Sequence, residues 1–231
     1  MTKFKRYLGF SMICLLSNIA VISAQEVDPK PDFPLQFSVS HGIHDELVIY
    51  VTGDGGWNSF NQQMVQEFEH QGYGVVAFNS RKYFWSGKSP EDFARDIAQL
   101  TDYYLQGWKK SSVIFVGYSF GADVVSFVPN RLSTALQKKI KRIALISPSA
   151  STDFVIRLSD LVGETENLNR RYKVKPEIDQ IEFPVVCSFG KEEVKVLKSS
   201  LKSRNNLTTI ELPGDHRYNN DYSLLLKGIG L

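Results

Sequence analysis

A serine between two glycines, in the stretch SSVIFVGYSFGADVVSFV, constrains the fold of this chain more than any other feature. An apolar run of strand length, residues 113–116, precedes the motif, and apolar residues at helical spacing follow it. Ser119 therefore stands where a buried strand turns into a helix. Gly117 and Gly121 omit the Cβ atoms that would clash in so sharp a turn. The pattern predicts a nucleophile elbow, in which a reactive serine projects from the end of a sheet.

Continuous apolar runs of strand length recur along the chain, and amphipathic helical patterns lie between them. The clearest helix begins at Ser89, a candidate N-cap followed by Pro90 and two acids. This alternation predicts a three-layer α/β-hydrolase fold with a mainly parallel sheet covered on both faces. The longest irregular region, residues 149–182, has room for a short cap but not for a large lid domain. The expected strands cover residues 35–39, 47–51, 75–78, 113–116, 143–146, 184–189 and 207–212.

Residues 1–24 resemble a secretory signal peptide. Three basic residues are followed by a short, mostly apolar stretch that ends in the small residues Ser23 and Ala24. A retained membrane anchor is the alternative, although an anchor usually needs about 20 predominantly apolar residues. We expect one domain over residues 25–231, located in the periplasm or secreted.

The basic character of the chain belongs to this leader. Of 27 basic and 25 acidic residues, three basic ones lie in the leader, so its removal changes the net charge from +2 to −1. This balance gives no reason to expect a nucleic-acid partner. Of the two cysteines, Cys14 leaves with the leader and Cys187 lies in an apolar run, where we expect a buried side chain and no internal disulfide.

A serine nucleophile needs a general base, an acid that orients the base, and donors for the oxyanion. Elbow-type hydrolases place these groups in the chain order serine, acid, histidine. Only one of the four histidines, His216, follows Ser119. It comes directly after the last expected strand, where a loop would bring it to the strand ends. We therefore predict His216 as the base.

The acid is expected in the loop after the preceding strand, where Gly-Lys-Glu-Glu occupies residues 190–193. Glu193 is the first choice and Glu192 the second. Asp153, which follows an earlier strand, is a further alternative. Asp215 is a poor candidate because a residue seldom turns its carboxylate onto the ring of its sequence neighbour.

The first oxyanion donor is expected to be the backbone N–H of Phe120, which follows the nucleophile at a helix start. The second should come from the glycine-rich turn GDGGW, residues 53–57, with Gly55 or Asp54 as the donor. A tight turn without a catalytic role is the alternative. The mechanism requires no metal and no cofactor; a metal site at His41, His44 and Asp45 would depend on one weak spacing.

Four blocks of sequence follow one another along the chain: GDGGW at 53–57, SRKYFW at 80–85 with SPE at 89–91, GYSFGAD at 117–123, and PGDH at 213–216 with DY at 221–222. Together they resemble the bacterial VirJ/AcvB virulence-protein family. The resemblance implies an exported α/β-hydrolase-fold protein with Ser119 and His216 at the family's serine and histidine. Family members are associated with type IV secretion-linked virulence and with hydrolysis of aminoacylated phosphatidylglycerol in the periplasm. The last block departs from the family pattern of two glycines and two histidines, but it keeps the first histidine.

A cation and aromatic residues that follow a strand end are candidates for substrate contact. Arg81, Tyr83 and Trp85 belong to this group, and Trp57 follows the glycine-rich turn. Packing of these aromatics into the core is the alternative.

These observations predict an exported serine esterase that uses a Ser-His-acid triad. Its substrate would be a small-molecule or lipid ester, with aminoacylated phosphatidylglycerol implied by the resemblance, and it could contact membrane lipid peripherally. The alternative is a noncatalytic periplasmic binding protein of hydrolase fold, linked to secretion or virulence.

Overall fold

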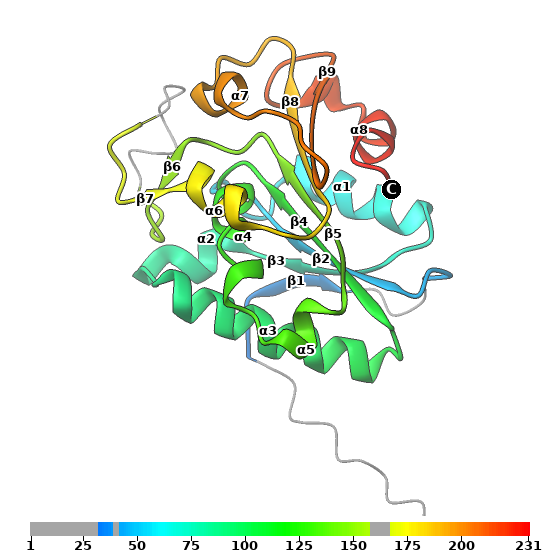
Figure 1. Cartoon of the computed structure of the whole chain (residues 1–231). Coiled ribbons are helices and arrows are strands. Elements are labelled where there is room, and N and C mark those ends of the chain that lie inside the picture. Colours follow the sequence, from blue (N-terminus) through cyan, green and yellow to red (C-terminus); the bar gives the residue numbers. More distant parts are fainter. Residues whose placement is uncertain (1–31, 39–41, 158–166) are drawn as a thin grey trace, which may run out of the picture.

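The computed structural model describes residues 32–38, 42–157 and 167–231 (Figure 1). The expected signal peptide, residues 1–24, lies outside these ranges. Within them, no helix combines the length and the apolar character needed to cross a membrane.

In the part of the chain that the structure describes, seven strands form one sheet, and every strand expected from the sequence is among them. The strands are β1 (Leu35–Ser38), β2 (Glu46–Val51), β3 (Gly74–Phe78), β4 (Ser112–Tyr118), β5 (Ile140–Ile146), β8 (Val185–Gly190) and β9 (Leu207–Leu212). Their order across the sheet is β1-β3-β2-β4-β5-β8-β9. Only β1 is antiparallel to its neighbour, so the prediction of a mainly parallel sheet is confirmed.

Helices connect the strands and cover both faces of the sheet (Figure 1). Ser89 caps α3 as expected, since its Oγ accepts a hydrogen bond from the Asp92 N–H at 3.0 Å. The helices are α1 (Ser59–His70), α2 (Ser80–Tyr83), α3 (Pro90–Gly107), α4 (Phe120–Val125), α5 (Thr134–Gln137), α6 (Val174–Gln180), α7 (Val196–Ser200) and α8 (Tyr222–Gly228), with short 3-10 turns at η1 (Phe84–Ser86), η2 (Pro129–Arg131) and η4 (Tyr218–Asn220).

The two faces of the sheet form two separate hydrophobic cores. In β2, Leu47, Ile49 and Val51 pack with residues of α3 and α4, whereas Val48 and Tyr50 pack with residues of α1 and α8. This alternation follows from the strand period of two, and burial on both sides explains the continuous apolar runs in the sequence. The three layers are therefore confirmed. Cys187 is fully buried in the first core, and burial raises the pKa of its thiol to about 12.

The region expected to be irregular holds one small antiparallel pair, β6 (Ser151–Thr152) and β7 (Tyr172–Lys173), followed by α6. In the parts of this region that the structure describes, these elements make a small cap and no large lid.

The order of the strands fixes where a ligand can bind. From β2 the chain continues to β3 on one side, whereas from β4 it continues to β5 on the other side. The connections therefore diverge between β2 and β4. In open α/β sheets, ligands bind at the carboxyl ends of strands beside such a point. The loop after β2 and Ser119 after β4 both lie there.

Candidate active site

Ser119 adopts a strained backbone conformation directly after β4. Its φ of 54° and ψ of −122° lie in a region that residues other than glycine rarely adopt. Its N–H donates to Ile146 O at 2.8 Å, and its own carbonyl oxygen accepts from the Ala122 N–H at 2.8 Å. These bonds fix the turn on both sides. The geometry is that of a nucleophile elbow.

The two flanking glycines leave no space for a side chain. A Cβ at Gly117 would lie 2.4 Å from the Gly121 carbonyl oxygen, and a Cβ at Gly121 would lie 2.1 Å from the Val51 carbonyl oxygen. The motif therefore lets α4 pack directly on the ends of β2 and β4. Phe120, the first residue of α4, has an N–H without an intrahelical acceptor.

His216 and Glu193 are hydrogen bonded to each other. His216 Nδ1 lies 2.6 Å from Glu193 Oε1. The carboxylate is nearly buried, and its Oε2 accepts from Ser147 Oγ and from the Gly190 N–H, each at 2.7 Å. Burial raises the pKa of Glu193, but the hydrogen bonds from His216, Gly190 and Ser147 outweigh this effect and the pKa is lowered. An ionised Glu193 holds a proton on Nδ1 and leaves Nε2 of the imidazole as an acceptor.

The loops that carry these two residues contact each other closely. The Glu192 N–H donates to Gly214 O at 3.1 Å, and a Cβ at Gly190 would lie 2.2 Å from Asp215 O. On the other side, Tyr118 Oη donates to His216 O at 3.1 Å, and the two rings are 5.2 Å apart. The histidine loop is thus fixed to both β4 and β8.

The glycine-rich turn after β2 comes close to Ser119. A Cβ on Gly53 would lie 3.4 Å from the Ser119 Cβ. The Gly55 N–H donates to Asp54 Oδ1 at 2.9 Å, and the Gly56 N–H donates to Gly53 O at 3.0 Å. The Gly55 and Gly56 amides therefore already donate hydrogen bonds within the turn.

A buried asparagine, which the sequence interpretation missed, holds this turn. Asn61 Nδ2 donates to Gly56 O at 2.6 Å, and Asn61 Oδ1 accepts from Tyr50 Oη at 2.5 Å. Asn58 caps α1 and adds a contact to Asn61 Nδ2 at 3.1 Å. The sequence did carry one signal for this role: Asn61 is polar but stands in line, at helical spacing, with the apolar residues Met64, Val65 and Phe68 of α1.

One cavity of about 610 Å³ joins these elements. Ser119, His216 and Glu193 all line it, together with Asp54, Gly55 and Phe120. Ser149 also lines the cavity. Its Oγ accepts from Lys195 Nζ at 3.1 Å, and its N–H donates to Asp123 Oδ1 at 2.6 Å. The structure thus brings the first-choice triad residues and the expected oxyanion donors to one cavity.

The two alternative acids lie elsewhere. Glu192 is exposed and does not line the cavity. Asp153 is also outside the cavity; it accepts from the Arg171 N–H at 2.9 Å and pairs with Arg157 at 3.3 Å. Of the three candidate carboxylates, only Glu193 contacts His216.

The four residues expected at the substrate do not line the cavity. Tyr83 is a core residue: its ring packs on Phe78 and its Oη donates to Asp96 Oδ2 at 2.5 Å. Burial raises the pKa of the Tyr83 hydroxyl above the ordinary tyrosine value. Packing therefore accounts for Tyr83. Arg81 and Trp85 are exposed outside the cavity, and Trp57 is partly buried against the core under α1.

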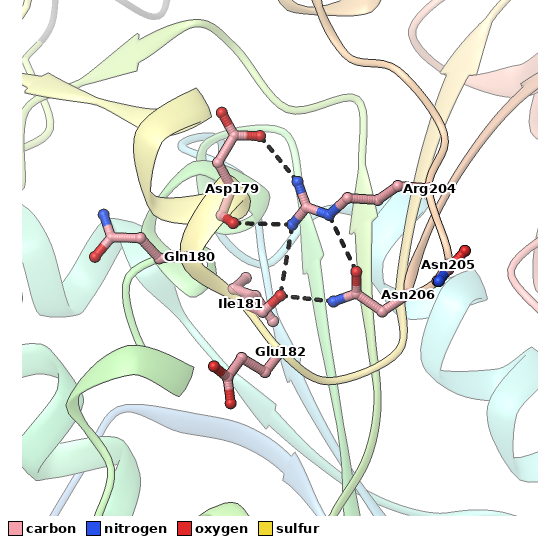
Figure 2. Close-up of a pocket in the computed structure, with 7 residues that line it drawn as sticks. All are labelled: Asp179, Gln180, Ile181, Glu182, Arg204, Asn205 and Asn206. Atoms are coloured by element: carbon pink, nitrogen blue, oxygen red, sulfur yellow. Dashed lines mark hydrogen bonds and ion pairs between the residues drawn. The ribbon is translucent and has the colours of Figure 1, made fainter.

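A second hollow lies between the end of α6 and the turn before β9, and Figure 2 shows four of the residues that line it, Asp179, Ile181, Arg204 and Asn206, bound to one another. The Arg204 guanidinium donates to Asp179 Oδ1 and to the carbonyl oxygens of residues 178, 179 and 181. Asn206 Nδ2 donates to Ile181 O and Phe183 O. Protein partners therefore already occupy the Arg204 guanidinium and the Asn206 side chain.

The described residues contain no cluster of three or more His, Cys, Asp or Glu side chains suited to a metal. His41 lies outside the described residues. The His44 ring stacks on Tyr73 at 4.1 Å and contacts Gln71 O at 3.0 Å, so packing accounts for it.

Residues 45–229 match a family model described as bacterial virulence protein (VirJ). A search of curated proteins gives no significant match. Similar solved structures include an esterase from Pyrococcus furiosus, with a TM-score of 0.60 and 21% identity over 80% of this chain and 79% of that chain. A lipase-esterase related protein from Clostridium acetobutylicum has a TM-score of 0.59 and 14% identity over 84% of this chain and 99% of that chain. Est1E from Butyrivibrio proteoclasticus has a TM-score of 0.56 and 17% identity over 80% of this chain and 85% of that chain. At these identities the likeness shows the α/β-hydrolase fold alone.

Proposed function

The chain belongs to the bacterial virulence protein (VirJ) family, and we propose that it is an exported serine hydrolase that cleaves an ester bond. The observation that carries this proposal is the 2.6 Å contact between His216 Nδ1 and Glu193 Oε1, in the cavity that Ser119 also lines. An oriented imidazole that shares a cavity with a serine on a strained elbow fits the arrangement that activates a serine hydroxyl. Export is proposed from the leader-like residues 1–24.

In the proposed reaction, Ser119 Oγ attacks the carbonyl carbon of the ester while His216 Nε2 takes its proton. The imidazolium that forms is stabilised by Glu193. It then gives the proton to the leaving alcohol, and an acyl group remains on Ser119. Water, activated by the same imidazole, attacks this acyl-enzyme and releases the acid and the free serine.

The developing oxyanion would accept hydrogen bonds from two backbone amides. We assign the first to Phe120, at the start of α4, and the second to Asp54. The sequence leaves Asp54 and Gly55 as alternatives, but the Gly55 N–H already donates to Asp54 Oδ1. Asp54 also follows Gly53, the residue of this turn whose backbone comes close to Ser119.

We propose a lipid ester of the cell envelope as the substrate. The family resemblance favours aminoacylated phosphatidylglycerol. The cavity volume suits a ligand of moderate size. Val194, which is 96% exposed, belongs to the cavity lining, and Val196 and Leu168 are also exposed. An exposed apolar side chain at the cavity, as at Val194, suits a site that meets a lipid surface.

The test is labelling with a fluorescent phosphonate that reacts with activated serines. The wild-type protein should be labelled on the peptide that contains Ser119, and the Ser119→Ala and His216→Ala variants should not be labelled. Ser149→Ala is the matched control, because Ser149 lines the same cavity and should not affect labelling. Undiminished labelling of Ser119→Ala would refute the proposal, whereas a folded wild-type protein without any label would favour the noncatalytic binding role. Lipidomics of the cell envelope with the wild-type and Ser119→Ala proteins then identifies the lipid that accumulates.

A further inference from the structure

Two buried hydroxyl groups extend from Glu193 away from the cavity. Ser147 Oγ lies 2.7 Å from Glu193 Oε2, and Tyr218 Oη lies 2.7 Å from Ser147 Oγ. Ser147 is completely buried and Tyr218 is 2% exposed. Neither residue lines the cavity, so neither would touch a substrate there.

The chemistry of the groups fixes the direction of these hydrogen bonds. An ionised carboxylate only accepts, so Ser147 must give its single hydroxyl proton to Glu193. The contact between Ser147 and Tyr218 then requires Tyr218 to donate to Ser147 Oγ. Tyr218 Oη also lies 3.0 Å from Ser188 O, so its proton is shared between two acceptors. The chain of donors therefore points from Tyr218 through Ser147 to Glu193.

The backbone at both hydroxyl residues gives a second, independent observation. Ser147, the residue after β5, has a φ of 53°, and Tyr218 in η4 also has a φ of 53°. Residues other than glycine keep this left-handed conformation only when their surroundings hold them there, and such residues cluster at functional sites. The Ser147 N–H donates to Ser188 O at 2.8 Å, which ties the strained residue to β8.

We propose that Ser147 and Tyr218 are positioning residues that orient the Glu193 carboxylate toward His216; this role depends on the proposed function. The Ser147 hydroxyl and the Gly190 N–H both bind Oε2, which fixes the plane of the carboxylate and leaves Oε1 for the imidazole. They also draw negative charge away from Oε1. Ser147 therefore sets how strongly Glu193 attracts the proton on His216.

Other charged or titratable groups surround this pair and are unchanged in the variants below. The groups from other elements are Tyr118 at the end of β4, Asp54 after β2, Asp123 in α4 and Lys195 before α7, and the groups near the pair in sequence are Glu192, Asp215 and Arg217.

The experiment compares Ser147→Ala and Tyr218→Phe with the wild-type protein by NMR titration of the His216 imidazole. Without the Ser147 donor, the carboxylate concentrates more charge toward His216, so the imidazole should hold its proton to higher pH. The midpoint of the titration should be higher in Ser147→Ala than in the wild-type protein, and Tyr218→Phe should move it less in the same direction. Tyr83→Phe is the matched control, because it removes another buried tyrosine hydroxyl, bound to Asp96, and should leave the midpoint unchanged.

A purely structural role would lower the melting temperature without moving this midpoint. An unchanged or lowered midpoint in the folded variants would therefore overturn the proposal. If Ser147→Ala does not fold, Tyr218→Phe decides the question alone. The titration needs no turnover, so its result is separate from phosphonate labelling at Ser119, which tests the proposed function.

Discussion

Glu193 Oε1 and His216 Nδ1 lie 2.6 Å apart although the two residues belong to loops after different strands. The register of β8 and β9 explains this contact. Gly190 pairs with Leu212 at the ends of these parallel strands, and the two loops leave the sheet at the same level. The Lys191 N–H donates to Leu212 O at 2.8 Å, which holds the start of one loop to the end of the other strand. The pairing of acid and base thus follows from the sheet itself.

Replacing Glu193 by Gln should lower kcat for ester hydrolysis by about 10²- to 10⁴-fold. The neutral amide cannot stabilise the imidazolium, and its NH2 group would favour the wrong imidazole tautomer. Steady-state kinetics on a chromogenic ester measures the effect. Glu192→Gln is the control, since Glu192 is exposed outside the cavity and should retain nearly full activity. An equal loss in both variants would exclude a specific role for Glu193.

The same carboxylate should make stability depend on pH. The folded pKa of Glu193 is lowered, so its ionised form stabilises the folded state above the ordinary glutamate pKa of about 4.3. This contribution should be lost as the pH falls through the lowered value. Urea unfolding of the wild-type and Glu193→Gln proteins from pH 7 to pH 3 should show a difference in unfolding free energy that narrows below about pH 4.3. A difference that stays constant over this range would contradict the assignment.

The strands of the sheet could be predicted from the sequence, because strands that are buried on both faces appear as continuous apolar runs. The sequence also singled out His216 as the candidate base, because a single histidine follows Ser119. The contact of Glu193 with His216 matches the first choice among three acids, whereas the catalytic role of the pair stays a prediction.

The supporting residues could not be found in this way. Ser147 is separated by 46 positions from Glu193 and by 71 positions from Tyr218, and only the folded sheet brings them together. The aromatic segment after β3 was ambiguous for a related reason. Alternation along a short helix does not reveal which side meets the core, and Tyr83 proved to be buried while Trp85 is 55% exposed.

Gly121→Ala should destabilise the protein by about 3 kcal/mol or more, because the added methyl group would lie 2.1 Å from Val51 O and the backbone would have to move. Gly107→Ala is a matched control at the end of α3, where a Cβ would meet no atom within 4 Å. This control should be neutral or stabilising by about 0.5–1 kcal/mol. Urea unfolding measures both variants, and comparable stabilities for the two would show that the tight packing under α4 is not required.

Val194→Ser should weaken binding to vesicles that contain phosphatidylglycerol by about 10-fold, if the exposed valine enters the lipid interface. Ile43→Ser removes an aliphatic side chain of similar exposure, 89% accessible, before β2 at the opposite end of the sheet. This control should bind vesicles as the wild-type protein does. Cosedimentation measures binding, and equal effects of both substitutions would argue against a lipid surface at the cavity mouth.

Asn61→Ala should lower kcat by about 10- to 100-fold with little change in KM, because the turn that carries the Asp54 amide would lose its anchor at Gly56 O. Tyr50→Phe removes the donor to Asn61 Oδ1 and should have a smaller effect in the same direction. Asn206→Ala is the matched control, since Asn206 Nδ2 also donates to backbone carbonyl oxygens, Ile181 O and Phe183 O, but lies far from the cavity. Ester kinetics at saturating substrate separates the variants. A loss of stability in Asn61→Ala with kcat intact would mean that Asn61 supports the fold without holding the oxyanion donor.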